Sequence, residues 1–254
     1  MDLGLAGRRA LITGATRGIG LAIAETLADE GVDIAICSRD AQAVEAQVGR
    51  LQAKGVKAWG RAADVSDAAA LASWVDGAAE ALGGLDIAVS NPSAMVFRNA
   101  EADWRAAFEV DLLGSIRLFD ACRVYLEAAA TENGDAAYLM ISSLSALETT
   151  RVSPYGALKA ALNHYAKGLA TEMAPKGVRA NVIAPGNIFH TGGVWDNVKT
   201  RSPEAFAHSL AANPTGRMGA PQEVADSVAF LASPRSRFTI GAQLLIDGSL
   251  SQRV

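Results

Sequence analysis

The chain has 254 residues, 50% of them hydrophobic and 20% charged, which is ample for a large buried core and fits one domain spanning residues 1–254. Its net charge of −4 comes from 23 basic and 27 acidic residues spread along the chain, so we expect neither nucleic acid nor a membrane surface as a partner. The three histidines show no metal-ligand spacing, so we expect no metal site.

In chain order, short β-branched runs alternate with longer helical patterns. This alternation predicts an α/β fold of right-handed βαβ units, with a parallel sheet covered by helices on both faces. The strands read as continuous apolar runs, as a sheet buried on both sides requires. The expected strands are 9–13, 33–38, 56–62, 85–90, 136–142, 178–184 and 243–247, and the expected helices are 19–30, 41–54, 67–82, about 103–131, 154–174 and 222–233.

One stretch, residues 187–215, has only a weak helical pattern although it carries several aromatic side chains. Because an insertion of this size inside a compact fold is usually functional, we expect a substrate-binding lid there.

The compartment is predicted from what the sequence lacks. The start, MDLGLAGRRALITG, does not have the basic-then-apolar order of a signal peptide, and no apolar run approaches the ~18 residues of a membrane span. Cys37 and Cys122 lie in apolar settings without CxxC spacing, which is typical of buried free thiols in a reducing compartment. We therefore expect a cytoplasmic protein.

The stretch ALITGATRGIGLAIAETLADEG is a predicted strand, a glycine-rich turn and a predicted helix, in that order. Gly14, Gly18 and Gly20 let the backbone turn tightly and approach a pyrophosphate, and the following helix presents N–H groups and a positive dipole. With a second strand about 20 residues further on, this context predicts dinucleotide binding.

The tip of the second strand should contact the adenosine ribose. It reads ICSRD, which places Ser38 at the tip and Arg39 beside it, while Arg17 lies in the glycine turn. Two guanidinium groups suit a 2′-phosphate, so we expect NADP. The alternative is NAD, with Asp40 as the ribose acceptor if the register differs by two.

The stretch SPYGALKAAL begins another predicted helix, with Ser153 able to cap it and Pro154 suited to its first position. Tyr155 and Lys159 are four residues apart and share one helix face. A nearby ammonium favours the phenolate, so the pair is a candidate proton donor. Alone, such a pair also occurs by chance in many amphipathic helices.

Taken together, these motifs resemble the short-chain dehydrogenase/reductase family over nearly the whole chain, in particular its short, 3-oxoacyl reductase-like branch. The resemblance implies a Rossmann-type, doubly wound sheet of seven parallel strands in the order 3-2-1-4-5-6-7, in a homodimer or homotetramer. The matching motifs are TGxxxGIG at Thr13–Gly20, the adenine-binding Asp64 and Val65, a serine at Ser143 or alternatively Ser142, YxxxK at Tyr155 and Lys159, and the turn Pro185–Gly186.

The sequence departs from the family in three places. Of the usual NNAG only Asn91 remains, within SNPS at Ser90–Ser93, where Pro92 should stiffen the turn. The C-terminal DGG is DGS at Asp247–Ser249, and the family's catalytic asparagine is replaced by Asp111.

The resemblance implies roles for individual residues. The expected catalytic residues are Ser143, Tyr155, Lys159 and Asp111. The expected cofactor-binding residues are Gly14, Thr16, Arg17, Gly18, Ile19, Gly20, Ser38, Arg39, Asp64, Val65, Asn91, Tyr155, Lys159, Pro185, Gly186 and Ile188. The expected substrate-binding residues are Ser142, Leu144, Met95, Phe189, His190 and Trp195.

We therefore expect an NADP(H)-dependent carbonyl reductase or alcohol dehydrogenase, with NAD as a possible cofactor, that interconverts a small-molecule ketone and a secondary alcohol. The apolar and aromatic pocket candidates, which also include Phe97 and Leu147, favour a bulky apolar or 3-oxoacyl substrate. The alternative is a cofactor-binding sensor or scaffold that has kept the fold and lost the chemistry, which Asp111 leaves open.

Overall fold

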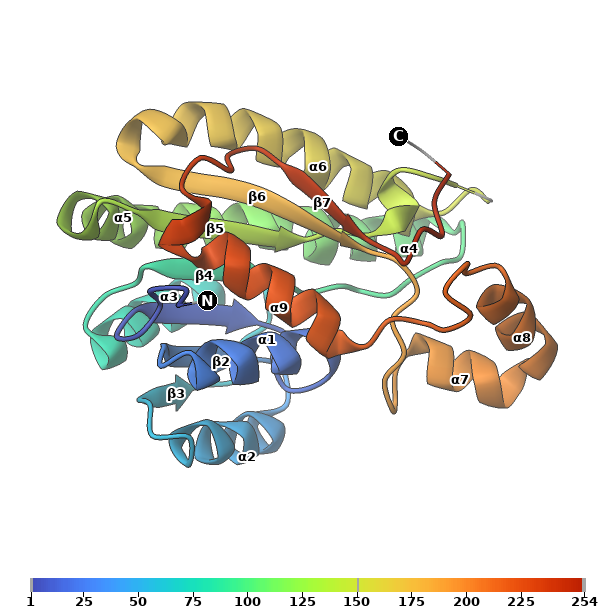
Figure 1. Ribbon diagram of the computed structural model, residues 1–254, viewed down its shortest axis with the longest axis horizontal. Coiled ribbons are helices and arrows are strands. Elements are labelled where there is room, and N and C mark those ends of the chain that lie inside the picture. The colour runs from blue at the N-terminus through green and yellow to red at the C-terminus, as the bar shows by residue number, and fades with distance from the viewer. Residues whose placement is uncertain (1, 150, 253–254) are drawn as a thin grey trace.

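The computed structural model describes residues 2–149 and 151–252, and its centre is a parallel sheet of seven strands in the order β3-β2-β1-β4-β5-β6-β7 (Figure 1). The predicted sheet and strand order are confirmed. The strands are β1 (Arg9–Thr13), β2 (Asp33–Cys37), β3 (Ala58–Gly60), β4 (Ile87–Ser90), β5 (Ala136–Ile141), β6 (Val178–Pro185) and β7 (Gln243–Ile246). The helices are α1 (Gly18–Asp29), α2 (Ala41–Gln52), α3 (Ala68–Leu82), α4 (Glu101–Ala107), α5 (Gly114–Asn133), α6 (Pro154–Met173), α7 (Val194–Arg201), α8 (Pro203–Ala211) and α9 (Pro221–Ala232).

The order of the strands creates a crevice at one edge of the sheet. β1 pairs with β2 on one side and with β4 on the other, so the chain reverses its direction of winding between β3 and β4. The segments that follow β1 and β4 diverge at such a switch point, and ligands of open α/β sheets bind there, outside the carboxyl ends of the strands.

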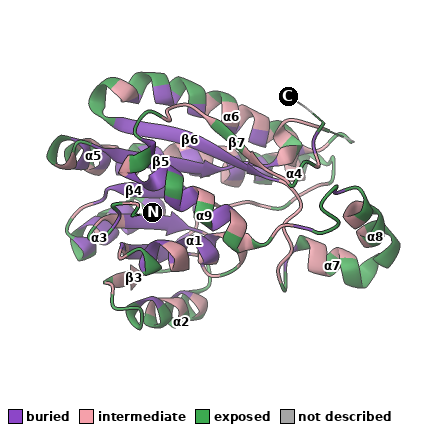
Figure 2. Cartoon of the chain, in the orientation of Figure 1, coloured by how far each residue is buried: buried purple, intermediate pink, exposed green. Residues whose placement is uncertain are grey.

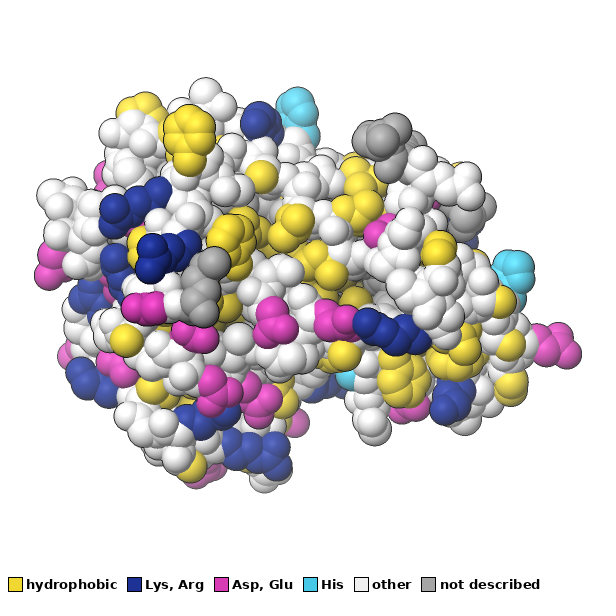
Figure 3. Space-filling model, viewed as in Figure 1, with side chains coloured by type: hydrophobic (Ala, Val, Ile, Leu, Met, Phe, Trp, Pro, Cys, Tyr) yellow, Lys and Arg dark blue, Asp and Glu magenta, His cyan; other side chains and the backbone are white. Residues whose placement is uncertain are grey.

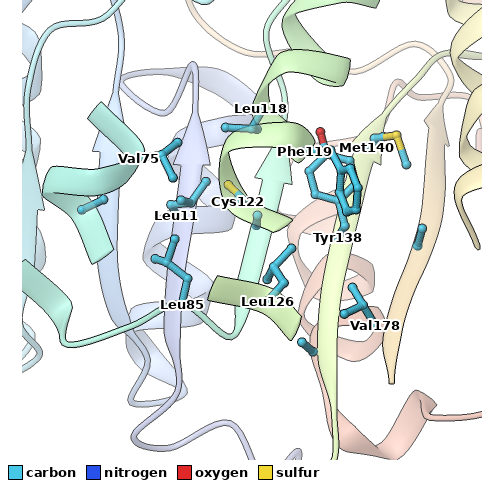
Figure 4. Close-up of a cluster of buried hydrophobic side chains, with 14 of the residues drawn as sticks. Leu11, Val75, Leu85, Leu118, Phe119, Cys122, Leu126, Tyr138, Met140 and Val178 are labelled. Carbon is cyan, nitrogen blue, oxygen red and sulfur yellow. The ribbon is translucent and has the colours of Figure 1, made fainter. Parts of the chain in front are cut away.

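Both faces of the sheet are buried, as the continuous apolar strands require. One face packs against α3, α5 and α6, around Val75, Phe119 and Tyr138 (Figure 4). The other face packs against α1, α2 and α9. The five inner strands are buried along most of their length, whereas the edge strands β3 and β7 are only partly covered (Figure 2). The helices α2, α3, α5, α6 and α9 each keep an exposed side.

Two predicted elements are wrong in detail. The expected long helix at 103–131 is broken into α4, a π-helical turn at Phe108–Leu113, and α5. The weakly patterned stretch 187–215 contains two helices, α7 and α8, which have no buried residue and project beyond the carboxyl edge of the sheet (Figure 1). Because a solvated helix needs no wide apolar stripe, its periodic pattern in the sequence is weak.

The cysteines and the surface charges lie as follows in the described part of the chain. Cys37 and Cys122 are buried free thiols, and burial raises the pKa of Cys37 to about 12. Basic and acidic side chains are interspersed on the face that Figure 3 shows. Within residues 2–149 and 151–252, no helix is long and apolar enough to cross a bilayer, and no cluster of His, Cys, Asp or Glu is arranged to hold a metal.

Candidate active site

The glycine turn between β1 and α1 forms a cradle of bare backbone. Gly14 and Gly18 have φ of +64° and +56°, a region that side-chain-bearing residues rarely adopt. A Cβ at Gly20 would collide with the carbonyl oxygen of Gly14. Since the cradle opens at the N-terminus of the 12-residue helix α1, it fits the pyrophosphate of a dinucleotide.

Asn91 holds this turn in place from the end of β4. Its side-chain amide donates to the carbonyl oxygens of Thr13 at 3.3 Å and Gly14 at 3.0 Å, and its own backbone N–H donates to Thr13 Oγ1 at 3.2 Å. The retained asparagine of the altered SNPS motif therefore positions the glycine turn. Direct contact between Asn91 and the cofactor stays a prediction.

The residues at the carboxyl end of β2 are those that favour an NADP 2′-phosphate over the 2′-hydroxyl of NAD. β2 ends at Cys37, so Ser38 and Arg39 follow directly at its carboxyl end. Asp40 is the N-cap of α2, where its carboxylate accepts from the N–H of Ala43 at 3.1 Å. Because this carboxylate already has a structural partner, the alternative of Asp40 as a ribose acceptor is weakened.

Asp64 follows β3 and is the residue predicted to contact the adenine of the cofactor. It accepts from the N–H of Ser66 at 2.9 Å and from its hydroxyl at 2.7 Å. These hydrogen bonds, with a smaller attraction from Arg39, lower the pKa of Asp64. The carboxylate therefore stays ionised, and the Arg39 guanidinium is close enough to interact with it.

Tyr155 and Lys159 lie on the first turns of α6, with the Lys159 ammonium 6.0 Å from the centre of the Tyr155 ring. Lys159 is buried, donates to the carbonyl oxygen of Ile141 at 2.9 Å, and pairs with Asp111 at 3.3 Å. Asp111 is fully buried, and its second carboxylate oxygen accepts from the N–H of Ala94 at 3.1 Å. A buried ammonium thus has both a carbonyl and a carboxylate as partners.

The π-helical turn Phe108–Leu113 brings Asp111 to this position. A π-turn inserts a residue into the helix and rotates the side chains around it, and such turns are frequent at functional sites. The sequence identified Asp111 through its family motif but contained no signal for the π geometry.

The end of β5 supplies the two serines, and they have different partners. The Ser142 hydroxyl is buried and donates to the carbonyl oxygen of Lys159 at 3.3 Å. Ser143 Oγ accepts from the N–H of Ser145 at 3.1 Å, which leaves its hydroxyl hydrogen free to donate. Any Cβ at Gly156 would lie 2.5 Å from the carbonyl oxygen of Ser145, so glycine there lets the serine loop approach α6 closely. This arrangement favours Ser143 as the catalytic candidate.

The Ser153 cap expected for α6 does not form. Ser153 makes no capping hydrogen bond, and its hydroxyl oxygen is buried without a partner among the described residues. Pro154 does occupy the first turn, as predicted.

The turn after β6 lies against the C-terminal segment. The backbone N–H of Gly186 donates to the carbonyl oxygen of Ile246 at 2.9 Å, and a Cβ on Gly186 would approach the Cβ of Asp247 to 2.7 Å. Ile188 then bridges to Gly219, which fixes the start of the 187–215 stretch.

The residues predicted to bind substrate lie in different parts of the structure. His190 lies against Gly18, where a Cβ would come within 2.7 Å of its Nε2, so it contacts the glycine turn. Phe189 packs on Phe206, with ring centres 6.1 Å apart, and the Lys199 amine lies 5.6 Å from the Phe189 ring. Leu144 is in the serine loop and Trp195 is on α7, both half-buried, and Met95 is exposed with φ of +51°. Their contact with substrate stays a prediction.

Two further side chains surround Tyr155. The Phe97 ring lies 5.1 Å from the Tyr155 ring, centre to centre, and the Arg151 guanidinium lies 5.6 Å from the Phe97 ring. Phe97 was among the pocket candidates because of its apolar ring. Arg151 was missed, since the sequence offered only its place four residues before Tyr155.

A dinucleotide cradle, a Tyr–Lys pair on one helix face and a serine loop against the same helix together define a Rossmann-type oxidoreductase. A family profile described as "Enoyl-(Acyl carrier protein) reductase" matches residues 14–251. The chain is 33% identical to isoepoxydon dehydrogenase patN of Penicillium expansum, over 98% of this chain and 97% of that protein. It is also 33% identical to cis-4-hydroxycyclohexanecarboxylate dehydrogenase of Sinomonas cyclohexanicum, over 98% of each.

Among solved structures, L-sorbose reductase from Gluconobacter frateurii, complexed with NADPH and L-sorbose, superposes with a TM-score of 0.91 at 28% identity, covering 100% of both chains. The chain belongs to the short-chain dehydrogenase/reductase family, and it is an oxidoreductase of CH–OH groups. The family resemblance, the fold and the enzyme class expected from the sequence are confirmed.

Proposed function

We propose that the protein is an NADP(H)-dependent oxidoreductase that interconverts a bulky apolar ketone, or a 3-oxoacyl compound, with its secondary alcohol. The observation that carries this proposal is the buried Lys159 ammonium, held beside Tyr155 by Ile141 and Asp111. The choice of NADP rests on Ser38 and Arg39 at the tip of β2 and on Asp40 being used as a helix cap.

The roles of the side chains follow from where they lie. NADPH, when bound, supplies the hydride, and Gly14, Gly18 and Gly20 leave room for its pyrophosphate. Tyr155 donates a proton to the carbonyl oxygen as that oxygen gains negative charge, and it takes the proton back during alcohol oxidation. Ser143 donates a hydrogen bond to the same oxygen. Lys159 favours the tyrosinate electrostatically.

The stretch 187–215 is proposed to close over the substrate. α7 and α8 stand at the carboxyl edge of the sheet, next to the ends of the strands that carry the site (Figure 1). Phe189, Phe206 and the ammonium of Lys199 form an internal contact that would let the two helices move as a unit. The named substrate of the Sinomonas relative is a ring alcohol, which fits the apolar walls proposed here.

Self-association is proposed as well, in a homodimer or homotetramer in the cytoplasm. Phe108 beside α5 is 43% exposed, and near the open edge of β7 Phe238 is fully exposed while Leu244 is 36% exposed. We infer that a second copy of the chain covers these apolar side chains. Light scattering on the purified protein measures the assembly.

The test of the proposed reaction is a panel of ketones and secondary alcohols, each assayed with NADPH or NADP and with NADH or NAD. Turnover of bulky ketones with NADPH supports the proposal. NADPH binding with no turnover of any ketone would instead support the alternative of a cofactor-binding sensor or scaffold.

A further inference from the structure

Phe97 connects Arg151 to the candidate proton donor. Its ring centre is 5.1 Å from that of Tyr155 and 5.6 Å from the Arg151 guanidinium carbon, so the guanidinium lies within about 11 Å, their sum, of the Tyr155 ring centre. A guanidinium lying over an aromatic face is held in place by the ring, and its N–H groups remain free to donate at its edge. Arg151 is therefore a positioned cation close to the reacting centre.

The charge of Arg151 is not neutralised within residues 2–149 and 151–252. Its guanidinium is exposed and makes no ion pair with a described carboxylate, whereas Arg105 and Arg217 each have a glutamate partner. The acid nearest to Arg151 in the chain, Glu148, accepts a hydrogen bond from the Ser251 hydroxyl. The guanidinium fork thus remains available to an anion that arrives with the substrate.

We propose that Arg151 recognises a carboxylate on the substrate, so that the physiological substrate is an oxo acid or hydroxy acid. The inference rests on the proposed function and narrows its substrate class. A carboxylate suits the guanidinium because two parallel N–H···O bonds of about 2.8 Å can form. Since about 11 Å is the longest separation that these two distances allow, the carbonyl and the carboxylate belong to one compact substrate, such as an oxo acid built on a single ring.

This upper limit also favours one kind of anion over another. The phosphates of a coenzyme A thioester lie at the far end of a long pantetheine arm, farther from the carbonyl than the limit of about 11 Å allows. A carboxylate attached to the ring that carries the carbonyl reaches Arg151 while the carbonyl reaches Tyr155. The phosphate alternative is therefore an outcome of the test.

The kinetic test compares 4-oxocyclohexanecarboxylate with its methyl ester, both reduced with saturating NADPH. We expect the wild type to prefer the acid, and Arg151→Gln to lower the acid-to-ester ratio of kcat/KM by about 10- to 100-fold, mainly through KM. Arg151→Lys, which keeps the charge and loses the fork, should fall between them. Arg98→Gln, the same charge change on an exposed residue beside Phe97, is the matched control and should leave the ratio unchanged.

Several results would overturn the inference. They are a wild-type ratio near one, an equal loss in Arg98→Gln and Arg151→Gln, or an Arg151-dependent preference for a 3-oxoacyl coenzyme A with none for the acid.

A binding experiment keeps the inference separate from the proposed reaction. Calorimetry on the complex with NADP measures the binding of cyclohexanecarboxylate and of the neutral cyclohexanecarboxamide, which have neither a ketone nor a hydroxyl group to react. Tighter binding of the carboxylate that is lost in Arg151→Gln supports the inference even if no ketone is turned over. Equal binding of the two compounds contradicts it even if ketones are turned over.

Discussion

The carboxylate of Asp111 lies 3.3 Å from the ammonium of Lys159, and both side chains are buried. At the position of the family's neutral asparagine, this chain thus has an anion paired directly with the lysine that acts on Tyr155. A negative charge here opposes a second negative charge on the nearby phenol and offsets part of the effect of the ammonium.

Replacing Asp111 by asparagine should keep the enzyme active and change its pH dependence. The amide oxygen of the new side chain can still accept from the Ala94 N–H, so the local structure should persist. Alcohol oxidation needs the tyrosinate as base, and removal of the carboxylate charge favours it, so the rising limb of kcat against pH should move to lower pH. The same limb is measured in Asp120→Asn, which neutralises an exposed aspartate on α5 and should not move it.

An unmoved limb in Asp111→Asn would mean that the Asp111 side chain has no electrostatic effect on Tyr155. A move to higher pH would mean that the sign of the electrostatic coupling is opposite to the one argued here.

Tyr155→Phe should reduce kcat by about 10²- to 10⁴-fold, the usual contribution of a positioned general acid. The ring still packs against Phe97, so the dissociation constant of NADPH should change little. Tyr165→Phe removes a hydroxyl from the same helix away from the catalytic residues and should retain activity. A Tyr155→Phe enzyme with more than about a tenth of the normal rate would show that the proton comes from another group.

Arg39→Asp should lower kcat/KM for NADPH by at least about tenfold and spare or improve NADH. The change removes a charge-assisted phosphate contact and introduces repulsion. Arg50→Asp, an equal charge change at an exposed position on α2, should leave the preference unchanged. A wild type that prefers NADH by tenfold would show that another group binds the ribose, with Asp40 the first candidate.

The parts of the fold that sequence could predict are those governed by local periodicity. β1 has the predicted bounds, and α2 and α6 begin at their predicted residues, because buried strands and amphipathic helices show their pattern directly. The π-turn around Asp111 was not predictable in this way, because it covers only six residues, too few to show a period of their own in the sequence. α7 and α8 were missed because neither packs into the core.

The candidate site was predictable where a motif determines the backbone. The glycine turn and the Tyr155–Lys159 pair formed as expected because their geometry is set within a few residues. Contacts between distant segments were not predictable. The Phe97–Arg151 contact joins two loops, and the His190–Gly18 contact joins residues that are far apart in the sequence. Both contacts therefore depend on tertiary packing.

Ser249→Gly should stabilise the protein. Ser249 replaces the second glycine of the family's DGG and has φ of +64°, where a Cβ costs roughly 1–2 kcal/mol. Glycine relieves this strain but gains freedom in the unfolded chain, so we expect a net increase of about 0.5–1 kcal/mol in the free energy of unfolding. Ser249→Ala keeps the Cβ and should not stabilise. Urea unfolding measures all three proteins, and equal stability of the glycine and alanine variants would contradict the strain argument.

Asp86 lies at the edge of the sheet opposite the candidate site. It should make the free energy of unfolding depend on pH. Its carboxylate accepts from Arg9 Nε at 2.7 Å, from Arg8 at 3.2 Å and from the Asn133 amide at 2.7 Å. Burial raises the pKa of Asp86, but the hydrogen bonds and charges of the two arginines lower it by more, and the net pKa is below the ordinary value. A carboxyl group whose pKa is lower in the folded state stabilises that state when it is ionised.

This stabilisation is fully present above the ordinary aspartate pKa of about 4 and is lost as the pH falls through the lower folded value. Asp86→Asn should therefore reduce the free energy of unfolding at pH 7 by about 1.5–3 kcal/mol, the range for hydrogen bonds to a charged group, and the difference from wild type should shrink below about pH 4. Asp29→Asn breaks an exposed pair with Lys54 and should cost under about 0.5 kcal/mol at either pH. Urea unfolding from pH 7 down to pH 3.5 makes the comparison. If the difference for Asp86→Asn is the same at every pH, the loss comes from packing and the ionised carboxylate contributes nothing.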